Sequence, residues 1–161
     1  MNQMQPRLRK SVARLNRCES MLDDFMALSR VLTGVEDIDV NLGRQYLDRL
    51  ASSPFQPQLD EILGRFRGLK KSDKLVEHVK AKIVEVDRLR PAVCQIILLW
   101  YTSTVQDNLG MNPPAPSPSF RYGTPEEYFS GLAWKIIGAH PPGLSGGYFG
   151  HWRYRPDNEP K

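Results

Sequence analysis

Apolar side chains recur every three or four positions through most of the first hundred residues, which is the period of an amphipathic α-helix. The first such stretch runs from Leu8 to Leu32 and ends at Thr33-Gly34, because glycine adopts the left-handed conformation that closes a helix. The first seventeen residues hold five basic side chains and no acid, which fits a basic arm or a solvated helix face. The pattern favours the helix face, since most charge runs are solvated.

Three further stretches with the same period predict helices up to residue 86. Asp37 and Asp39 stand where an N-cap is needed before the first of them, which carries Leu42, Tyr46 and Leu50. The second runs from about Pro57 to Leu69, with proline tolerated in the first turn. Ser72 or Asp73 is expected to cap the third, which places four apolar residues on one side: Val76, Val79, Ile83 and Val86.

The most apolar element follows Pro91. Residues 92–101 are apolar apart from Gln95, and we interpret them as a buried helix, although their β-branched content leaves a strand open. After Tyr101 the composition changes, and residues 112–118 hold four prolines, which exclude a helix or a central strand.

A last helix is predicted from Thr124 to near Gly138. Thr124 suits the N-cap, Pro125 the first position and Glu127 the third, which together form a capping box with a proline start. Beyond it the chain is expected to be extended and irregular. Nine of the 15 aromatic residues and nine of the 13 prolines follow residue 112, and an irregular segment rich in aromatics usually lies along a surface that it did not build alone.

These elements predict an all-α fold, a small bundle of about five to six helices with a long C-terminal tail rich in proline, glycine and aromatics. We divide the chain into four segments: 1–17, a basic arm or helix start; 18–111, the helical core; 112–123, a proline-rich linker; and 124–161, the final helix and tail.

Length and charge narrow the class of protein. The 161 residues suit one domain, and a net charge of +4 is too small to indicate nucleic-acid binding. No apolar run approaches the roughly 20 residues that cross a bilayer, and neither a secretory signal nor a pair of adjacent arginines is present. As written, the chain is expected in the cytoplasm, or in the periplasm if a partner carries it there.

Motifs for catalysis or cofactor binding are missing from the sequence. It contains neither GxGxxG nor GxxxxGK[ST], so we expect no cofactor in this chain. His78 is interpreted as an exposed helix residue and Cys94 as a small core residue, which leaves no nucleophile with a base. His140 and His151 with Asp157 have the wrong spacing for a compact metal site. Adjacent acidic pairs are interpreted as surface and cap residues: Asp23-Asp24, Asp60-Glu61 and Glu126-Glu127.

Five phrases occur in an order that resembles a known family. The chain is similar to the small (gamma-type) subunits of membrane-associated, FAD-dependent sorbitol, fructose and glucose dehydrogenases, over about residues 22–156. The resemblance is strongest in the first phrase and at the C-terminal end. The phrases are Phe25–Gly34, Leu98–Thr102, Tyr128–Lys135, Gly138–Gly143 and Gly146–Trp152.

The resemblance implies a helical, non-catalytic subunit that wraps a large flavoprotein of the glucose-methanol-choline (GMC) type. In that family the large subunit holds the FAD and the substrate site, a multihaem cytochrome commonly accepts the electrons, and the small subunit frequently supplies the export signal. The residues that the resemblance marks as facing the partner or anchoring the tail are Trp100, Tyr101, Trp134, His140, Pro141, Pro142, Tyr148, Phe149 and Trp152.

Two other classes remain open from the sequence. A freestanding helical adaptor or nucleic-acid-binding protein would use the basic residues of the first segment, and its binding would weaken steeply with salt. A hydrolase or metalloenzyme is disfavoured by the missing nucleophile, base and ligand set. Trp134 has the helix spacing of an ordinary core residue, whereas Trp152 lies beyond every predicted helix.

Overall fold

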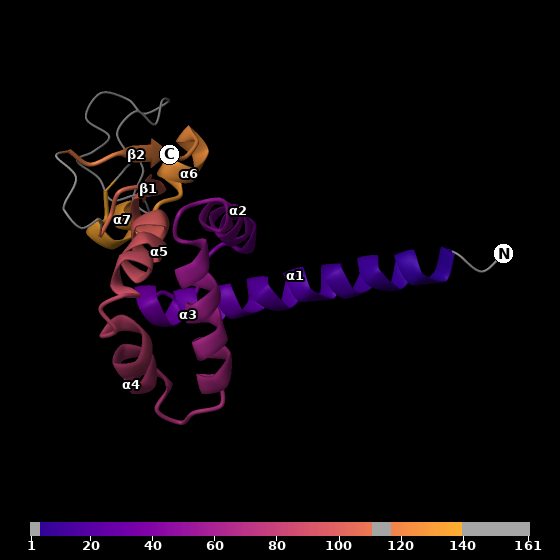
Figure 1. Cartoon of the computed structure of the whole chain (residues 1–161). Helices are drawn as coiled ribbons and strands as arrows, with labels where there is room; N and C mark the ends of the chain where they lie inside the picture. The colour runs from indigo at the N-terminus through magenta and orange to yellow at the C-terminus, as the bar shows by residue number, and fades with distance from the viewer. Residues whose placement is uncertain (1–3, 111–116, 140–161) are drawn as a thin grey trace, which may run out of the picture. The chain divides into compact units, whose positions relative to one another are not determined.

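The computed structural model describes residues 4–110 and 117–139, with the backbone alone for residues 4–17. The chain forms two compact units, one up to Val93 and one from Cys94 onward. The first unit contains helices α1 (Met4–Thr33), α2 (Val40–Ala51), α3 (Gln56–Leu69) and α4 (Leu75–Val79), followed by a π-helical turn, Lys80–Val84. Helix α5 (Arg90–Thr102) begins in the first unit and continues into the second (Figure 1).

Helix α1 packs against α2 and α3 through its C-terminal half. Among the α1 side chains that the structure describes, residues 18–33, the buried apolar ones begin at Leu22, and the backbone before them extends past α2 and α3 in Figure 1. The basic first segment is therefore helical from Met4, as the solvated-face interpretation expects. Gly34 has a φ of +69°, and its N–H donates to Arg30 O, so glycine closes this helix as predicted.

The core of the first unit lies where α1, α2 and α3 meet. Each helix contributes the apolar stripe that its sequence predicts, and burial of these side chains supplies most of the favourable free energy of folding. The least exposed members are Phe25, Leu28, Tyr46, Leu50, Leu59, Ile62, Leu63, Phe66, Ile83 and Leu89.

In the first unit, two of the predicted helix starts are correct and one is wrong. The Asp39 carboxylate accepts a hydrogen bond from Leu42 N at 2.7 Å and caps α2, and α3 begins beside Pro57. The prediction that Ser72 or Asp73 caps the next helix is wrong, because α4 starts after Lys74 without a side-chain cap. Ser72 Oγ instead accepts from Lys74 N.

The helix predicted to extend to Val86 is shorter than expected. It changes to π geometry at Lys80, where the wider turn leaves Lys82 O to accept a hydrogen bond from Arg65 Nη1 at 2.7 Å. Only two of its four predicted apolar residues, Val79 and Ile83, are buried, whereas Val76 is 63% exposed.

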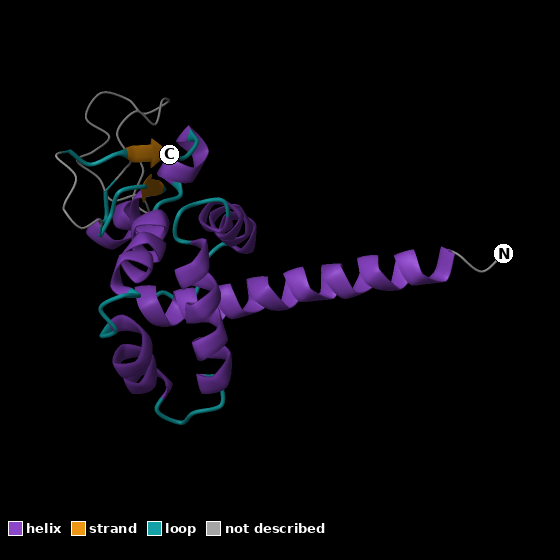
Figure 2. Ribbon diagram, viewed as in Figure 1, coloured by secondary structure: helices purple, strands orange, loops and turns teal. Residues whose placement is uncertain are grey.

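The second unit combines the rest of α5 with strands β1 (Thr104–Gln106) and β2 (Phe120–Tyr122) and helices α6 (Pro125–Phe129) and α7 (Leu132–Ile137). Residues 92–101 are helical, which settles the choice between helix and strand. The strands pair antiparallel, with Val105 opposite Arg121. The described fold is mostly helical, as predicted, and Figure 2 shows this sheet as its strand component.

The single final helix predicted from Thr124 is two helices. Its start is correct, because Thr124 and Glu127 form the capping box. The helix then breaks at Ser130-Gly131. A Cβ on Gly131 would lie 2.7 Å from Tyr101 O, so the close approach of these two backbones requires glycine. Helix α7 ends at Gly138, whose φ is +61°.

Candidate partner-binding site

Trp100 and Tyr101, both predicted to contact a partner or anchor the tail, lie in the last turn of α5. Trp100 is 1% exposed, and Tyr101 is half-buried. The burial of Trp100 follows from the register of α5, which turns Ile96, Leu99 and Trp100 toward the core and leaves Tyr101 at its edge. Trp100 is therefore a core residue of the chain as described, and the predicted binding role of both residues stays a prediction.

Trp134 lies on α7, half-buried. Its Nε1 donates to Tyr128 O at 2.9 Å, and its ring meets that of Tyr128 nearly edge-on, with centroids 5.2 Å apart. These contacts fix the corner between α6 and α7. The other predicted partner-binding residues, His140, Pro141, Pro142, Tyr148, Phe149 and Trp152, lie outside the described residues.

Buried polar contacts hold the second unit together around Ser103. This residue ends α5 with a φ of +55°, its Oγ donates to Glu127 O at 2.7 Å, and its carbonyl accepts from Gly123 N at 2.8 Å. Glu127 is 6% exposed and is a cap residue, as its acidic pair predicts. These contacts tie the end of α5 to the chain between β2 and α6, at the Thr104–Tyr122 end of the sheet.

An apolar hollow of about 330 Å³ lies beside this junction. Its lining includes Thr102, Tyr122, Pro125, Tyr128 and Phe129. None of the described residues that line it is charged, so it suits an uncharged group better than an ionic ligand. The sequence pattern did not single out these residues as a group. The alternation of aromatic, basic and aromatic residues in Phe120-Arg121-Tyr122 is the signal that could have indicated the strand.

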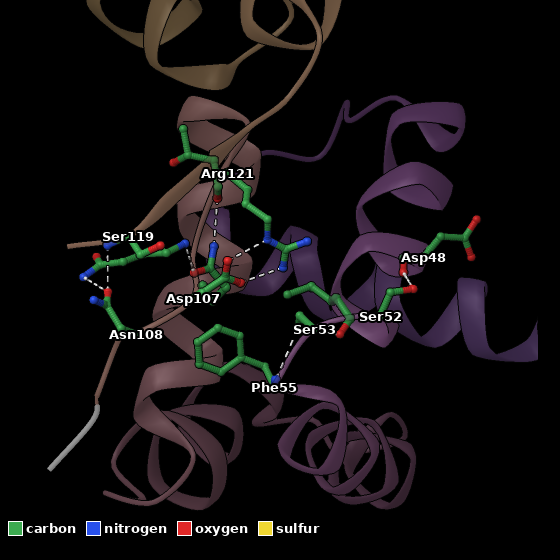
Figure 3. Close-up of polar contacts among 12 residues, drawn as sticks. Asp48, Ser52, Ser53, Phe55, Asp107, Asn108, Ser119 and Arg121 are labelled. Atoms are coloured by element: carbon green, nitrogen blue, oxygen red, sulfur yellow. Dashed lines mark hydrogen bonds and ion pairs between the residues drawn. The ribbon is translucent and has the colours of Figure 1, made fainter. Parts of the chain in front are cut away.

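Arg121 and Asp107 form a two-point ion pair across the sheet (Figure 3). Arg121 Nε lies 2.7 Å from Asp107 Oδ2, and Arg121 Nη2 lies 2.6 Å from Oδ1. The hydrogen bonds to Asp107 raise the pKa of Arg121 above its ordinary value. Both charges are therefore compensated locally.

In the first unit, Asp24 is buried rather than a surface residue, which corrects the interpretation of Asp23-Asp24. It is 2% exposed, accepts a hydrogen bond from Arg67 Nε at 2.7 Å and pairs with Lys70. Burial is the largest single influence on the pKa of Asp24 and raises it. The hydrogen bonds and charges of Lys70 and Arg67 together outweigh burial, and the pKa lies below its ordinary value.

Ser72 and His78 form a hydroxyl–imidazole pair that the sequence did not predict. Ser72 Oγ lies 2.8 Å from His78 Nδ1 and also accepts from Lys74 N. A catalytic pair needs a third group that orients the base. Within the described ranges the His78 ring has no second hydrogen-bond partner. We therefore interpret the Ser72–His78 pair as a structural contact that stabilises the start of α4.

Metal and membrane sites can be assessed over the described residues. Those residues contain no cluster of three or more His, Cys, Asp or Glu side chains suited to a metal ion. The alternative metal ligands His140, His151 and Asp157 lie outside them. None of the described helices is both long enough and apolar enough to span a bilayer.

Comparison with known families identifies the chain. Residues 3–114 match the family described as membrane bound FAD containing D-sorbitol dehydrogenase. The chain belongs to this family. No curated protein matches it. The match confirms the resemblance found in the sequence and covers every helix from α1 to α5 together with β1.

Membership in the D-sorbitol dehydrogenase family associates the chain with an FAD-containing, membrane-bound enzyme. The matched residues include Phe25–Gly34 and Leu98–Thr102, two of the five phrases that carried the resemblance. The apolar hollow is lined partly by matched Thr102 and partly by residues of β2 and α6, which follow the matched range.

Proposed function

We propose that this chain is a non-catalytic accessory subunit that wraps and stabilises the large FAD-dependent subunit, of the GMC type, in a sugar or polyol dehydrogenase complex. The observation that carries the proposal is the family match over residues 3–114, which ties the chain to an FAD-containing sorbitol dehydrogenase. The sequence contains no GxGxxG motif, so the proposal places the FAD in the large subunit.

Exposed apolar side chains of the second unit support a binding role. Four large hydrophobic residues within a short stretch of chain keep between 41% and 75% of their surface exposed. Single exposed apolar residues are ordinary, but a concentration of them in one small unit is typical of an interaction surface. The four are Phe120, Tyr122, Ile136 and Ile137.

The proposed contacts with the large subunit come from two groups of residues. Tyr101 and Trp134 belong to the described part of the second unit, and Trp100 supports them from the core. The second group is the aromatic and proline-rich end of the chain, which provides large anchoring side chains: His140, Pro141, Pro142, Tyr148, Phe149 and Trp152.

The remaining steps of the proposal concern the complex as a whole. The large subunit oxidises the sugar or polyol at its FAD, and a cytochrome subunit accepts the electrons. The small chain assists maturation of the flavoprotein, or its export, by covering apolar surface that is otherwise open to solvent. Nucleic acid is not a partner in this proposal, and a cytoplasmic location for the chain stays a prediction.

Co-expression tests the stabilising role. The large subunit is produced with and without this chain, and soluble yield and melting temperature are compared. We expect lower yield and a lower melting temperature without the chain, because a partner that binds only the folded state stabilises it. Equal yield and equal melting temperature in the two preparations would contradict the proposal.

A further inference from the structure

The two edges of the small sheet differ in whether their backbone groups are hydrogen-bonded. On the outer edge of β1, the side chain of Gln95 takes the place of a neighbouring strand. Gln95 Nε2 donates to Thr104 O at 2.8 Å, and Gln106 N donates to Gln95 Oε1 at 2.8 Å. Gln95 is fully buried, so this edge is closed by the chain itself.

The outer edge of β2 is open. Gly123 N donates to Ser103 O, and Asp107 N donates to Ser119 O, so these residues face the partner strand. Backbone groups alternate in direction along a strand, which turns the N–H and C=O groups of Phe120 and Tyr122 outward. These outward groups make no hydrogen bond to the part of the chain that the structure describes, and all three residues of β2 are exposed.

Side chains beside this edge suit an uncharged, extended segment. Phe120 and Tyr122 lie on one face of β2 with ring centroids 6.2 Å apart, and Tyr122 also lines the apolar hollow with Pro125, Tyr128 and Phe129. The one charge on the strand, Arg121, is compensated by Asp107 (Figure 3). An edge with free donors and acceptors next to an apolar hollow is the arrangement used in strand addition, where the hollow receives one side chain.

The size of this surface decides between possible occupants. Phe120 and Tyr122 are 41% and 75% exposed, and an aromatic side chain offers about 150–250 Å². The two rings therefore provide a few hundred Å² at most, whereas a stable dimer buries about 800 Å² on each partner. A second copy bound here alone would dissociate, so the occupant must be held by other contacts as well.

We propose that the open edge of β2 and the adjoining hollow bind an extended, uncharged segment of the FAD-containing subunit, which adds to the sheet as a third strand. This inference rests on the proposed function, since it names the place where the large subunit contacts this chain. The added strand pairs with the N–H and C=O groups of Phe120 and Tyr122 and inserts one large apolar side chain among Tyr122, Pro125 and Tyr128.

Hydrogen exchange at single residues tests the pairing. The full chain is compared free and in complex with the FAD-containing subunit that copurifies with it. We expect the amides of Phe120 and Tyr122 to exchange rapidly in the free chain and about tenfold or more slower in the complex. The amide of Gly123, which donates to Ser103 O, is the internal reference and should be protected in both states.

Binding of two variants adds a second measurement. Phe120→Pro removes an outward N–H that the β1–β2 ladder does not use, and Tyr122→Ser removes the ring that borders the hollow. Each should weaken binding of the FAD-containing subunit by roughly tenfold. Val76→Ser removes an apolar side chain from the first unit whose exposure, 63%, lies between those of Phe120 and Tyr122, and it should leave binding unchanged.

The outcomes separate this inference from the proposed function. Slower exchange at Phe120 and Tyr122 in the complex supports strand addition. A complex that forms while both amides still exchange rapidly overturns the inference and leaves the accessory role intact. Protection that rises with the concentration of the chain alone would identify a second copy as the occupant and also overturn it. Failure of the wild-type chain to bind the FAD-containing subunit would overturn the proposed function itself.

Discussion

Asp24 is the residue whose surroundings depart most from what its place in the sequence suggests. It is buried on α1 and paired with Arg67 and Lys70 of the α3 end, 43 and 46 positions away. Burial of a carboxylate is costly unless charge and hydrogen bonds compensate it, and both are present here. The group therefore ties α1 to the end of α3 and fixes how the two helices pack.

Replacing Asp24 with asparagine should destabilise the chain. Asp24→Asn removes the charge from the pair and should lower the free energy of unfolding by about 2 kcal/mol at neutral pH. Chemical denaturation monitored by circular dichroism measures the change. Asp23→Asn, at the exposed neighbouring position, is the matched control and should change stability little. Equal losses in the two variants would contradict the assigned role.

The same pair predicts a dependence on pH. Because the pKa of folded Asp24 is lowered, its contribution is present above the pKa of the unfolded chain, about 3.9, and is lost as pH falls through the folded pKa. The stability difference between wild type and Asp24→Asn should therefore be constant near neutrality and shrink at acid pH. A difference that grows on acidification would show that the carboxylate is not stabilised by Arg67 and Lys70.

Trp152 gives the residue-scale prediction for binding. A buried aromatic anchor commonly carries about 2–4 kcal/mol of binding free energy, so Trp152→Ala should weaken association with the FAD-containing subunit by roughly 30-fold or more. Calorimetric titration measures the affinity, and thermal melting of the isolated chain is the control. A lower melting temperature with unchanged affinity would place Trp152 within this chain's own fold.

At the scale of helices and strands, the sequence predicted the elements set by local chemistry. Asp39 caps α2, Thr124 and Glu127 cap α6, and Gly34 and Gly138 adopt positive φ where helices end. Each of these caps depends on residues within one helical turn, so the local sequence is enough to predict it.

Features fixed by distant contacts were not predicted. A strand of three residues gives only a weak period-two signal, as in Phe120-Arg121-Tyr122, and the closure of β1 by Gln95 from another element gives no local signal. The break at Gly131 depends on Tyr101 O, and the burial of Asp24 depends on Arg67. In each case the partner lies outside the local window, and tertiary packing overrides the local pattern.

Two glycine substitutions test the difference between a position set by a distant contact and one set by local helix chemistry. Gly131→Ala would place a methyl group 2.7 Å from Tyr101 O and should destabilise the chain by about 1–3 kcal/mol. Gly64→Ala, within α3, has open space around the added methyl group and should stabilise by about 0.5–1 kcal/mol. Thermal denaturation of both variants gives the signs. A stabilising Gly131→Ala would show that the α6–α7 corner does not need a close backbone approach.

The basic first segment supplies a prediction for α1. Deleting residues 1–17 should leave association with the FAD-containing subunit largely unchanged, because five basic side chains and no acid are typical of a solvated helix face. Native gel shift or calorimetry checks the association. If the truncated chain no longer binds, the basic segment is part of the interface.

At the scale of the whole molecule, the chain combines a helical unit with its own core and a second unit whose short elements are held by caps and side-chain bridges. The family match spans the first unit and extends to residue 114. The exposed aromatic edge of β2 and the apolar residues of α7 follow that range, and they form the part of the described chain most open to a partner.

The central claim is that this chain supports an FAD-containing subunit but neither binds FAD nor oxidises the substrate itself. The most direct test is to purify the chain alone and together with its copurifying partner, and to record the absorption spectrum and sugar-oxidising activity of each preparation. We expect flavin absorbance and activity in the complex and neither in the isolated chain. A yellow, active preparation of this chain by itself would contradict the account.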